Sequence, residues 1–221
     1  MTQRLPIGLL FLGSLWLVGC PPKAPTMRTG PDVQPTYDGL YPVENAGFQM
    51  VWAKPGAGLA RYTKILVEKP SFHYRAVKGS GRPMEGEFEV PERRRDTFER
   101  IVQESFEKSL AKSKYYQMTT QPGPDTLLLV SALHDIVSKV PPEQANRGNT
   151  FVSEIGEATL VLELRDSESN EVLARAAERR AVAPTQQLSM SSGVNSASEV
   201  RKAAAQWGAK LRDQLDGLHE R

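Results

Sequence analysis

The chain has 221 residues, with 28 basic and 26 acidic side chains and a formal net charge of +2. A domain that binds nucleic acid carries a strong excess of positive charge, so this balance argues against that class of partner. The single cysteine, Cys20, excludes a disulfide bond within the chain. The length suits one folded domain with a tether.

The first predicted element is a secretory signal peptide over residues 1–19. Arg4 is the only charged residue in it, and residues 7–18 (IGLLFLGSLWLV) are almost entirely apolar. That run is too short for a helix that spans a membrane, which needs about 20 residues. The segment ends in Leu17-Val18-Gly19-Cys20. This ending resembles the bacterial lipobox, in which the chain is cut before the cysteine and the thiol is acylated.

The lipobox resemblance implies cleavage between Gly19 and Cys20 and a lipid anchor on Cys20. Two acyl chains are enough to hold a protein stably on a membrane that it does not span. In lipoproteins an aspartate directly after the cysteine tends to retain the protein in the inner membrane, and here that residue is Pro21. We therefore expect the outer membrane, with the protein facing the periplasm. A secreted protein with a chance cysteine and an uncleaved N-terminal anchor are the alternatives.

Residues 20–45 are expected to form a proline-rich tether behind the lipidated cysteine. Residues 21–42 contain six prolines and two glycines and show no apolar periodicity. Proline has no backbone N–H to offer a regular ladder, so an extended or disordered spacer is predicted. Partial docking of Tyr37, Leu40 and Tyr41 onto the folded domain is the alternative.

The folded domain is expected over residues 46–221. Residues 48–56 and 61–77 carry strand-like side chains separated by turn signals. Residues 91–114 predict a helix, with Pro91 in the first turn, where its missing N–H costs nothing. Apolar side chains recur there at steps of three and four, at Phe98, Ile101, Val102, Phe106 and Leu110.

Three more strands and a second helix are predicted downstream. Residues 125–140 begin with a nearly continuous apolar run, which is typical of a central strand covered on both faces. Residues 157–167 and 171–183 predict a hairpin. Residues 196–221 predict a helix that starts with a capping box of Ser196 and Glu199. This order predicts an α+β fold, a mainly antiparallel sheet of about five strands with two helices packed on one face.

The sequence contains no catalytic motif that we can identify. His73, His134 and His219 fall on three different predicted elements and have no metal-ligand spacing. No Gly-x-Ser-x-Gly turn and no phosphate-binding glycine loop occurs. We therefore predict no catalytic residue, no bound metal and no cofactor.

One charge cluster stands out, formed by Arg93, Arg94 and Arg95 in the first turn of the predicted helix at residues 91–114. Cations at that end oppose the helix dipole. Contact with an anionic lipid surface or glycan is one interpretation. The other is a solvated patch neutralised by neighbouring acidic residues, Glu85, Glu87, Glu89 and Glu92.

Four stretches of the sequence resemble the DUF3313 family of bacterial lipoproteins: residues 51–70, 123–136, 158–180 and 203–216. The chain departs from the family pattern at the predicted hairpin turn, where it has Ser169-Asn170 and the family typically has Thr-Gly. It also departs over residues 37–47. The resemblance implies a small envelope domain with helices and strands, and it implies no reaction.

The sequence thus predicts an envelope lipoprotein that binds an envelope protein or a glycan and is not an enzyme. The expected contact surfaces are an exposed edge at residues 171–183 and the polar loops at 141–150 and 184–198. One alternative is a hydrolase that gathers Asp135 or Glu163 with a histidine. Another is a structural lipoprotein without a dedicated partner.

Overall fold

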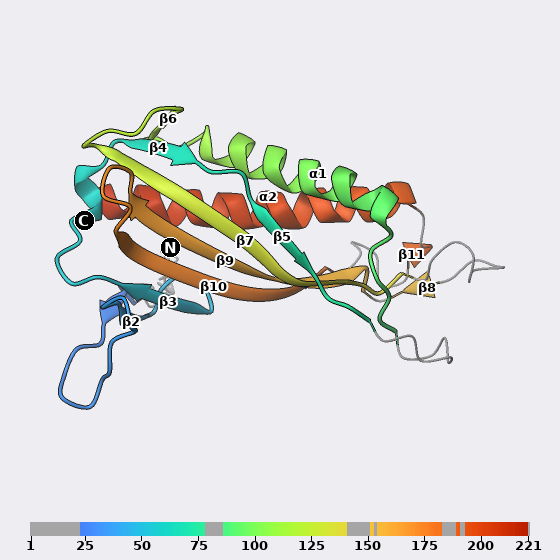
Figure 1. Cartoon of the computed structure of the whole chain (residues 1–221), viewed down its shortest axis with the longest axis horizontal. Coiled ribbons are helices and arrows are strands. Elements are labelled where there is room, and N and C mark those ends of the chain that lie inside the picture. The colour runs from blue at the N-terminus through green and yellow to red at the C-terminus, as the bar shows by residue number, and fades with distance from the viewer. Residues whose placement is uncertain are drawn as a thin grey trace, which may run out of the picture.

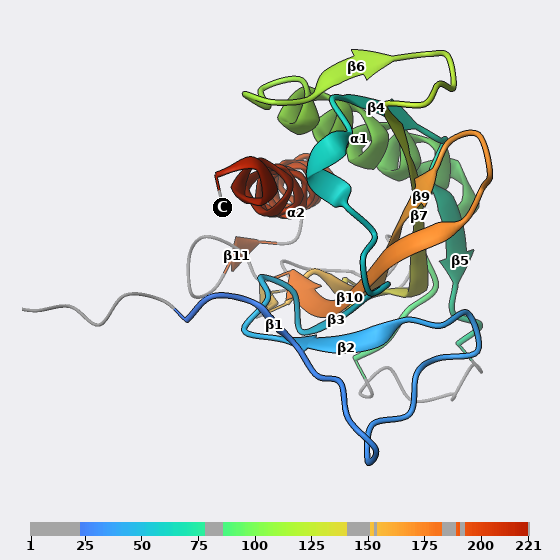
Figure 2. The same cartoon turned by 90° about the vertical axis from the view of Figure 1, so that its left-hand side faces the viewer.

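The computed structural model describes residues 23–77, 86–140, 151–152, 154–182, 189–190 and 193–220. Within these residues a curved sheet of nine strands wraps around two long helices, which lie side by side on its concave face (Figures 1 and 2). The strand order is β1-β2-β3-β10-β9-β7-β4-β6, and β5 also pairs with β7. The predicted α+β class, with both helices on one face, is confirmed.

The centre of the sheet consists of three long antiparallel strands, β7 (Thr126–Ser138), β9 (Gly156–Asp166) and β10 (Val172–Val182). The predicted hairpin is the pair β9–β10. Leu129 lies opposite Leu164, and Leu133 lies opposite Leu160. All four of these leucines are buried, because the alternating pattern puts them on the face that the helices cover.

Strand β7 is buried on one face only, which corrects the prediction that both faces are covered. Leu127 and Leu129 are fully buried. The residues between and after them, Leu128 and Val130, point to the opposite face and are only half-buried. The continuous apolar run therefore reflects one core face and one partly exposed apolar face.

The segment at residues 61–77 forms two strands instead of one. A 3-10 turn, η1 (Leu59–Arg61), leads into β4 (Lys64–Val67), and β5 (Ser71–Tyr74) follows after Pro70. Both strands run parallel to β7, and β6 (Gln117–Thr119) runs parallel to β4. The sheet is therefore mixed and has more strands than the five expected, although its long central pairs are antiparallel.

The N-terminal part of the described chain belongs to the sheet, so the expected tether does not extend to residue 45. Strand β1 (Thr26–Met27) pairs with β2 (Tyr41–Glu44), which pairs with β3 (Met50–Ala53). Leu40 is fully buried, whereas the Tyr37 side chain is exposed. The predicted signal peptide, Gly19 and Cys20 lie outside the described residues.

Strand β10 is not an edge strand over residues 174–177, which corrects the expected exposed edge. There β10 pairs with β3 on one side and with β9 on the other. One residue before β3, Gln49 extends this pairing with its side chain. Its amide oxygen accepts a bond from the Arg179 N–H at 3.0 Å, and its amide nitrogen donates to the Arg179 carbonyl at 3.1 Å.

The helices are α1 (Glu92–Leu110) and α2 (Gly193–His219). Helix α2 begins before Ser196, so Ser196 lies inside the helix and is not the cap that we predicted. The two helices approach closely at Gly208, where an added Cβ would lie 2.7 Å from the Cβ of Ser109. Ser109 satisfies its own hydroxyl by donating to the Ser105 carbonyl at 2.7 Å. Small residues at this crossing therefore set the distance between the helices.

Two short strands, β8 (Phe151–Val152) and β11 (Ser189–Met190), form a separate antiparallel pair. Strand β11 falls inside the predicted loop at 184–198, so that loop is shorter than expected. Most of the rest of that loop, and all of the predicted loop at 141–150, lie outside the described residues.

Candidate functional site

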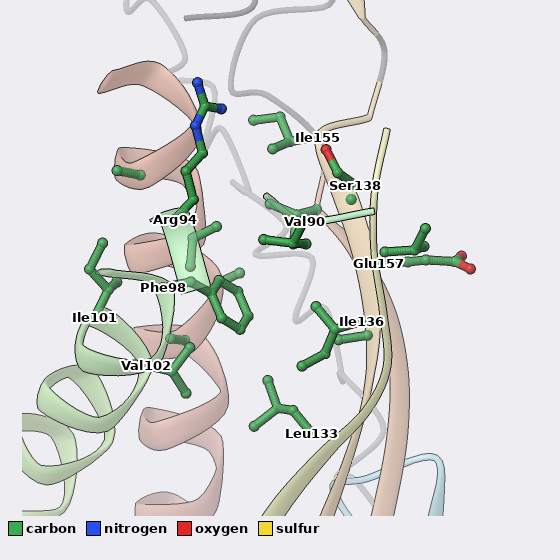
Figure 3. Close-up of a pocket in the computed structure, with 18 of the residues that line it drawn as sticks. Val90, Arg94, Phe98, Ile101, Val102, Leu133, Ile136, Ser138, Ile155 and Glu157 are labelled. Atoms are coloured by element: carbon green, nitrogen blue, oxygen red, sulfur yellow. The ribbon is translucent and has the colours of Figure 1, made fainter. Parts of the chain in front are cut away.

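A cavity of about 210 Å³ lies between the first halves of α1 and α2 and the ends of β7 and β9 (Figure 3). Apolar side chains from all four elements form its walls. Those labelled in Figure 3 include Phe98, Ile101 and Val102 from α1 and Leu133 and Ile136 from β7. No sequence pattern had pointed to this cavity.

A β-bulge in β7 shapes the cavity wall. His134 lies opposite Thr159 and Val137 lies opposite Glu157, so β7 has one more residue than β9 between these pairs. Asp135 is the extra residue and has a φ of 55°, a conformation that aspartate tolerates better than apolar residues do. As a result the consecutive residues Ile136 and Val137 are both buried and both line the cavity.

Two further backbone contacts lie at the same end of β7: the pairing of Phe88 with Ser138, and the close approach of Gly156 to Val137. The Phe88 N–H donates to the Ser138 carbonyl at 2.7 Å, and the Ser138 N–H donates to the Phe88 carbonyl at 2.8 Å. This pairing holds the segment that precedes α1 against the end of β7. Gly156 permits the close approach of β9 to β7, because an added Cβ would lie 2.6 Å from the Val137 carbonyl oxygen.

Charged groups contribute little to the interior of the cavity. Arg94 extends from α1 toward the end at which Ile155 and Ser138 lie, while the Glu157 carboxylate points away from the cavity (Figure 3). Glu157 Oε1 is 3.2 Å from a nitrogen of Arg75 and 2.6 Å from a nitrogen of Arg179. The cavity is therefore an apolar space with one cation at its end among the described lining residues.

The structure separates the three arginines of the predicted cluster. Arg93 is exposed, and Arg94 lines the cavity. Arg95 donates from Nε to the Val90 carbonyl at 3.2 Å, and its guanidinium carbon lies 4.5 Å from the centre of the Tyr74 ring. The three side chains therefore have three different surroundings and do not form one uniform patch.

Two of the acidic residues proposed to neutralise these arginines have other partners. Glu87 pairs with Arg75 at 3.1 Å and with Lys139 at 3.2 Å. The hydrogen bonds from Lys139 and Arg75 lower the pKa of Glu87 against the smaller effect of burial. Glu89 accepts the backbone N–H of Val77 at 3.3 Å.

Two histidines that the sequence placed on separate elements lie together in the structure. The rings of His73 and His134 stack with their centres 4.4 Å apart and an angle of 4° between their planes. The pairing of β5 with β7 causes this contact, and no local pattern could have shown it. His219 stacks on Tyr115, with ring centres 4.9 Å apart. Within the described residues no group of three potential metal ligands occurs.

The convex face of the sheet carries an ion-pair network that involves Glu163. Arg175 donates from Nε to Glu163 at 2.8 Å and also pairs with Asp38 at 2.5 Å. Burial acts to raise the pKa of Glu163, but the hydrogen bonds from Arg165 and Arg175 outweigh it and lower that pKa. Asp135 is exposed, and its Oδ1 lies 3.9 Å from Nε of Arg75. The Glu163 carboxylate is therefore held in its charged form by two arginines.

The hairpin turn between β9 and β10 contains a left-handed residue, Asn170. Asn170 has a φ of 59°, a left-handed conformation for which glycine is the usual residue and asparagine the next best. The Asn170 N–H donates to the Asp166 carbonyl at 2.9 Å. Asn170 therefore supplies the positive φ that this turn requires.

In the described parts of the chain, no helix is both long and apolar enough to cross a membrane. No curated protein matches the sequence.

Several solved structures resemble the chain at low identity. Protein XCC0632 from Xanthomonas campestris, of family DUF330, is 16% identical, with a TM-score of 0.40 over 72% of this chain and 87% of that one. The PelC dodecamer from Paraburkholderia phytofirmans is 16% identical, with a TM-score of 0.31 over 66% of this chain and 88% of that one. A homolog of the neuraminyllactose-binding hemagglutinin from Helicobacter pylori is 11% identical, with a TM-score of 0.38 over 72% and 86%. TM-scores this low carry no functional conclusion for this chain.

The family comparison covers most of the sequence. The model of a protein family of unknown function, DUF3313, matches residues 32–211, which include every strand of the sheet except β1. The match begins at residue 32, inside the segment that we expected to be a tether. This agrees with the structure, in which regular strands continue from β2 onward. The chain belongs to the DUF3313 family.

Proposed function

We propose that the chain is a lipoprotein of a bacterial cell envelope, attached through lipid on Cys20 to the outer membrane and facing the periplasm. Its folded domain would act there as a non-enzymatic binding or assembly module. The observation that carries the binding role is the cavity of about 210 Å³ with apolar walls. Concave apolar sites with few polar groups are typical of ligand binding. An envelope protein or a glycan remains the partner that the sequence suggests.

No specific observation favours the hydrolase alternative. A hydrolase needs a base within hydrogen-bond reach of a nucleophile or a water molecule. Glu163 is instead engaged by Arg165 and Arg175, and His134 is stacked on His73. These contacts leave neither group placed as a base beside a nucleophile in the described part of the domain.

The anchor is tested by mass spectrometry of the N-terminal peptide from protein purified from bacterial membranes. We expect the chain to start at Cys20 with acyl groups attached, and Cys20→Ser to abolish both the acylation and the cleavage before residue 20. An unmodified thiol at Cys20 in the native protein would overturn the proposal.

The choice of membrane is tested by a second substitution, Pro21→Asp, followed by density-gradient separation of inner and outer membranes. The wild-type protein should fractionate with the outer membrane and the variant with the inner membrane. Pro21→Ser serves as the matched control and should stay in the outer membrane. An inner-membrane location of the wild-type protein would contradict this part of the proposal.

A further inference from the structure

We propose that the convex side of the sheet, at the edge formed by β1, β2 and β3, lies against the bilayer surface with Tyr37 and Trp52 at the level of the lipid head groups. This inference rests on the proposed attachment at Cys20. It goes further by assigning the face of the domain that meets the membrane and the side chains that make the contact.

Tyr37 is held in an outward position. Its side chain is 95% exposed, the most of any large apolar side chain in the described part of the chain. It lies in the loop between β1 and β2, which projects from the body of the domain (Figures 1 and 2). Thr36 donates from Oγ1 to Oδ1 of Asp38 at 2.5 Å and accepts the N–H of Leu40, which is fully buried, at 3.0 Å. The exposure of the Tyr37 ring is therefore imposed by the bonds and packing of its neighbours.

A second aromatic side chain, Trp52 of β3, lies on the same side of the sheet and is partly exposed. Trp52 is directly opposite Arg175 of β10, and residues that are directly opposite each other share one face of a sheet. The guanidinium carbon of Arg175 lies 5.8 Å from the centre of the Tyr37 ring. Both aromatic side chains therefore neighbour Arg175 on the convex face.

Ion pairs neutralise the two arginines beside this surface. Arg175 pairs with Asp38 and Glu163, and Nε of Arg28 lies 3.4 Å from Oε1 of Glu44. The contact therefore needs no anionic lipid. Tyrosine and tryptophan are enriched at the head-group level of membranes, because each combines an apolar ring with a polar group. The chemistry of this surface matches that layer.

The position of the proposed anchor favours the bilayer over an envelope protein as the partner of this surface. Strand β1 begins at Thr26, six positions after Cys20, and it pairs with β2. Strand β2 in turn pairs with β3, with Pro42 opposite Trp52. A lipid on Cys20 would therefore hold this edge of the sheet near the head groups, where an exposed aromatic ring enters the interface.

Tryptophan fluorescence of the acylated protein in phosphatidylcholine nanodiscs tests the inference. The chain that starts at Cys20 has two tryptophans, Trp52 and Trp207, and Trp207 is buried in the core. Lipid that is brominated on its acyl chains close to the head group quenches only rings that it contacts. We expect brominated lipid to cause a loss of Trp52 emission that persists at high salt, since no net charge drives the contact. An unquenched Trp52 would overturn the inference and leave this face to a protein or a glycan.

Three variants sharpen the test. Trp52→Phe, which keeps only Trp207, should show no quenching. Tyr37→Ser should lose much of the Trp52 quenching, because the ring that enters the head-group layer is removed. Met118→Ser is the matched control, since Met118 is also exposed but lies in β6 at the other end of the strand order, and it should quench as the wild type does. Equal quenching in the Tyr37 and Met118 variants would contradict the assigned role of Tyr37.

A second form of the protein separates this inference from the anchor. The chain from residue 20 with Cys20→Ser and an N-terminal histidine tag is tethered to nickel-chelating lipid, so that the attachment point is kept without acylation. Quenching of Trp52 in this form, together with an unmodified Cys20 in the native protein, would overturn the anchor and leave the membrane-facing surface intact. An acylated Cys20 with no quenching in either form would do the reverse.

Discussion

The hydroxyl group of Tyr62 donates a hydrogen bond of 2.8 Å to Oδ2 of Asp166, although the two residues are more than a hundred positions apart in the chain. The Tyr62 side chain is completely buried. The other carboxylate oxygen, Oδ1, accepts the backbone N–H groups of Glu168 and Ser169 at 3.0 and 2.9 Å. A residue just before β4 is thereby bound to the turn of the central hairpin.

We expect Tyr62→Phe to lower the free energy of unfolding by about 1.5–3 kcal/mol, because hydrogen bonds to charged groups contribute that much. The ring would keep its packing, so the change isolates the hydroxyl group. Urea titration of the purified protein measures the effect. Tyr37→Phe is the control, since its side chain is exposed, and should have little effect. Equal stability of the Tyr62 variant and the wild type would contradict the importance of this bond.

The Asp166 carboxylate should make stability depend on pH in the acidic range. Hydrogen bonds from the Ser169 backbone and from Tyr62 lower the pKa of Asp166 from 3.8 to about 2. Because the pKa is depressed in the folded state, the stabilisation is present above about pH 4 and is lost as the pH falls toward 2. The loss should reach at most about 2 kcal/mol.

Asp166→Asn checks this prediction, because the variant cannot titrate at this position. The difference in unfolding free energy between wild type and variant, measured by urea titration at a series of pH values, should shrink as the pH falls from 4 to 2. Other carboxylates titrate equally in both proteins and cancel from the difference. A constant difference over this range would show that Asp166 has an ordinary pKa.

The helix crossing predicts a strong effect of Gly208→Val. An added Cβ would lie 2.7 Å from the Cβ of Ser109, so the helices would have to separate. Overpacking of this kind typically costs about 1–3 kcal/mol. Thermal unfolding measures it, and Gln206→Val, at an exposed position of the same helix, is the matched control. A variant at position 208 as stable as the control would show that the crossing can widen without cost.

The left-handed turn residue predicts opposite outcomes for two substitutions of Asn170. Asn170→Gly should leave stability within a few tenths of a kcal/mol of the wild type, because glycine adopts a positive φ without strain. Asn170→Ala should destabilise by about 1 kcal/mol, because a Cβ without a compensating polar group disfavours this conformation. Chemical denaturation of both variants distinguishes them. A more stable alanine variant would contradict the assigned turn geometry.

Much of the fold could be predicted from the sequence because its long elements carry local periodicity. The apolar steps from Phe98 to Leu110 predicted α1, and alternation along residues 157–167 predicted β9. The short strands β1, β2, β8 and β11 have no such pattern. The split at Pro70 and the parallel pairing of β4 and β5 with β7 depend on contacts between distant segments, which local periodicity does not encode.

The candidate site was predictable only in part. The unusual position of three arginines in the first turn of a helix drew attention to Arg94. The walls of the cavity depend on the bulge at Asp135 and the close approach at Gly156, which exist only when β7 meets β9. The only hint of the bulge in the sequence was Asp135 itself, a poor strand former in the middle of a strand. The stacking of His73 on His134 likewise depends on strand pairing and had no local signal.

The early start of the sheet limits how far the domain can travel from a lipid on Cys20. Thr26 is already held in β1, and five residues separate it from Cys20. Even a fully stretched chain spans only about 20 Å over that interval. An anchored molecule would therefore keep the β1 end of its domain beside the bilayer, with no room for a long spacer between the lipid and the sheet.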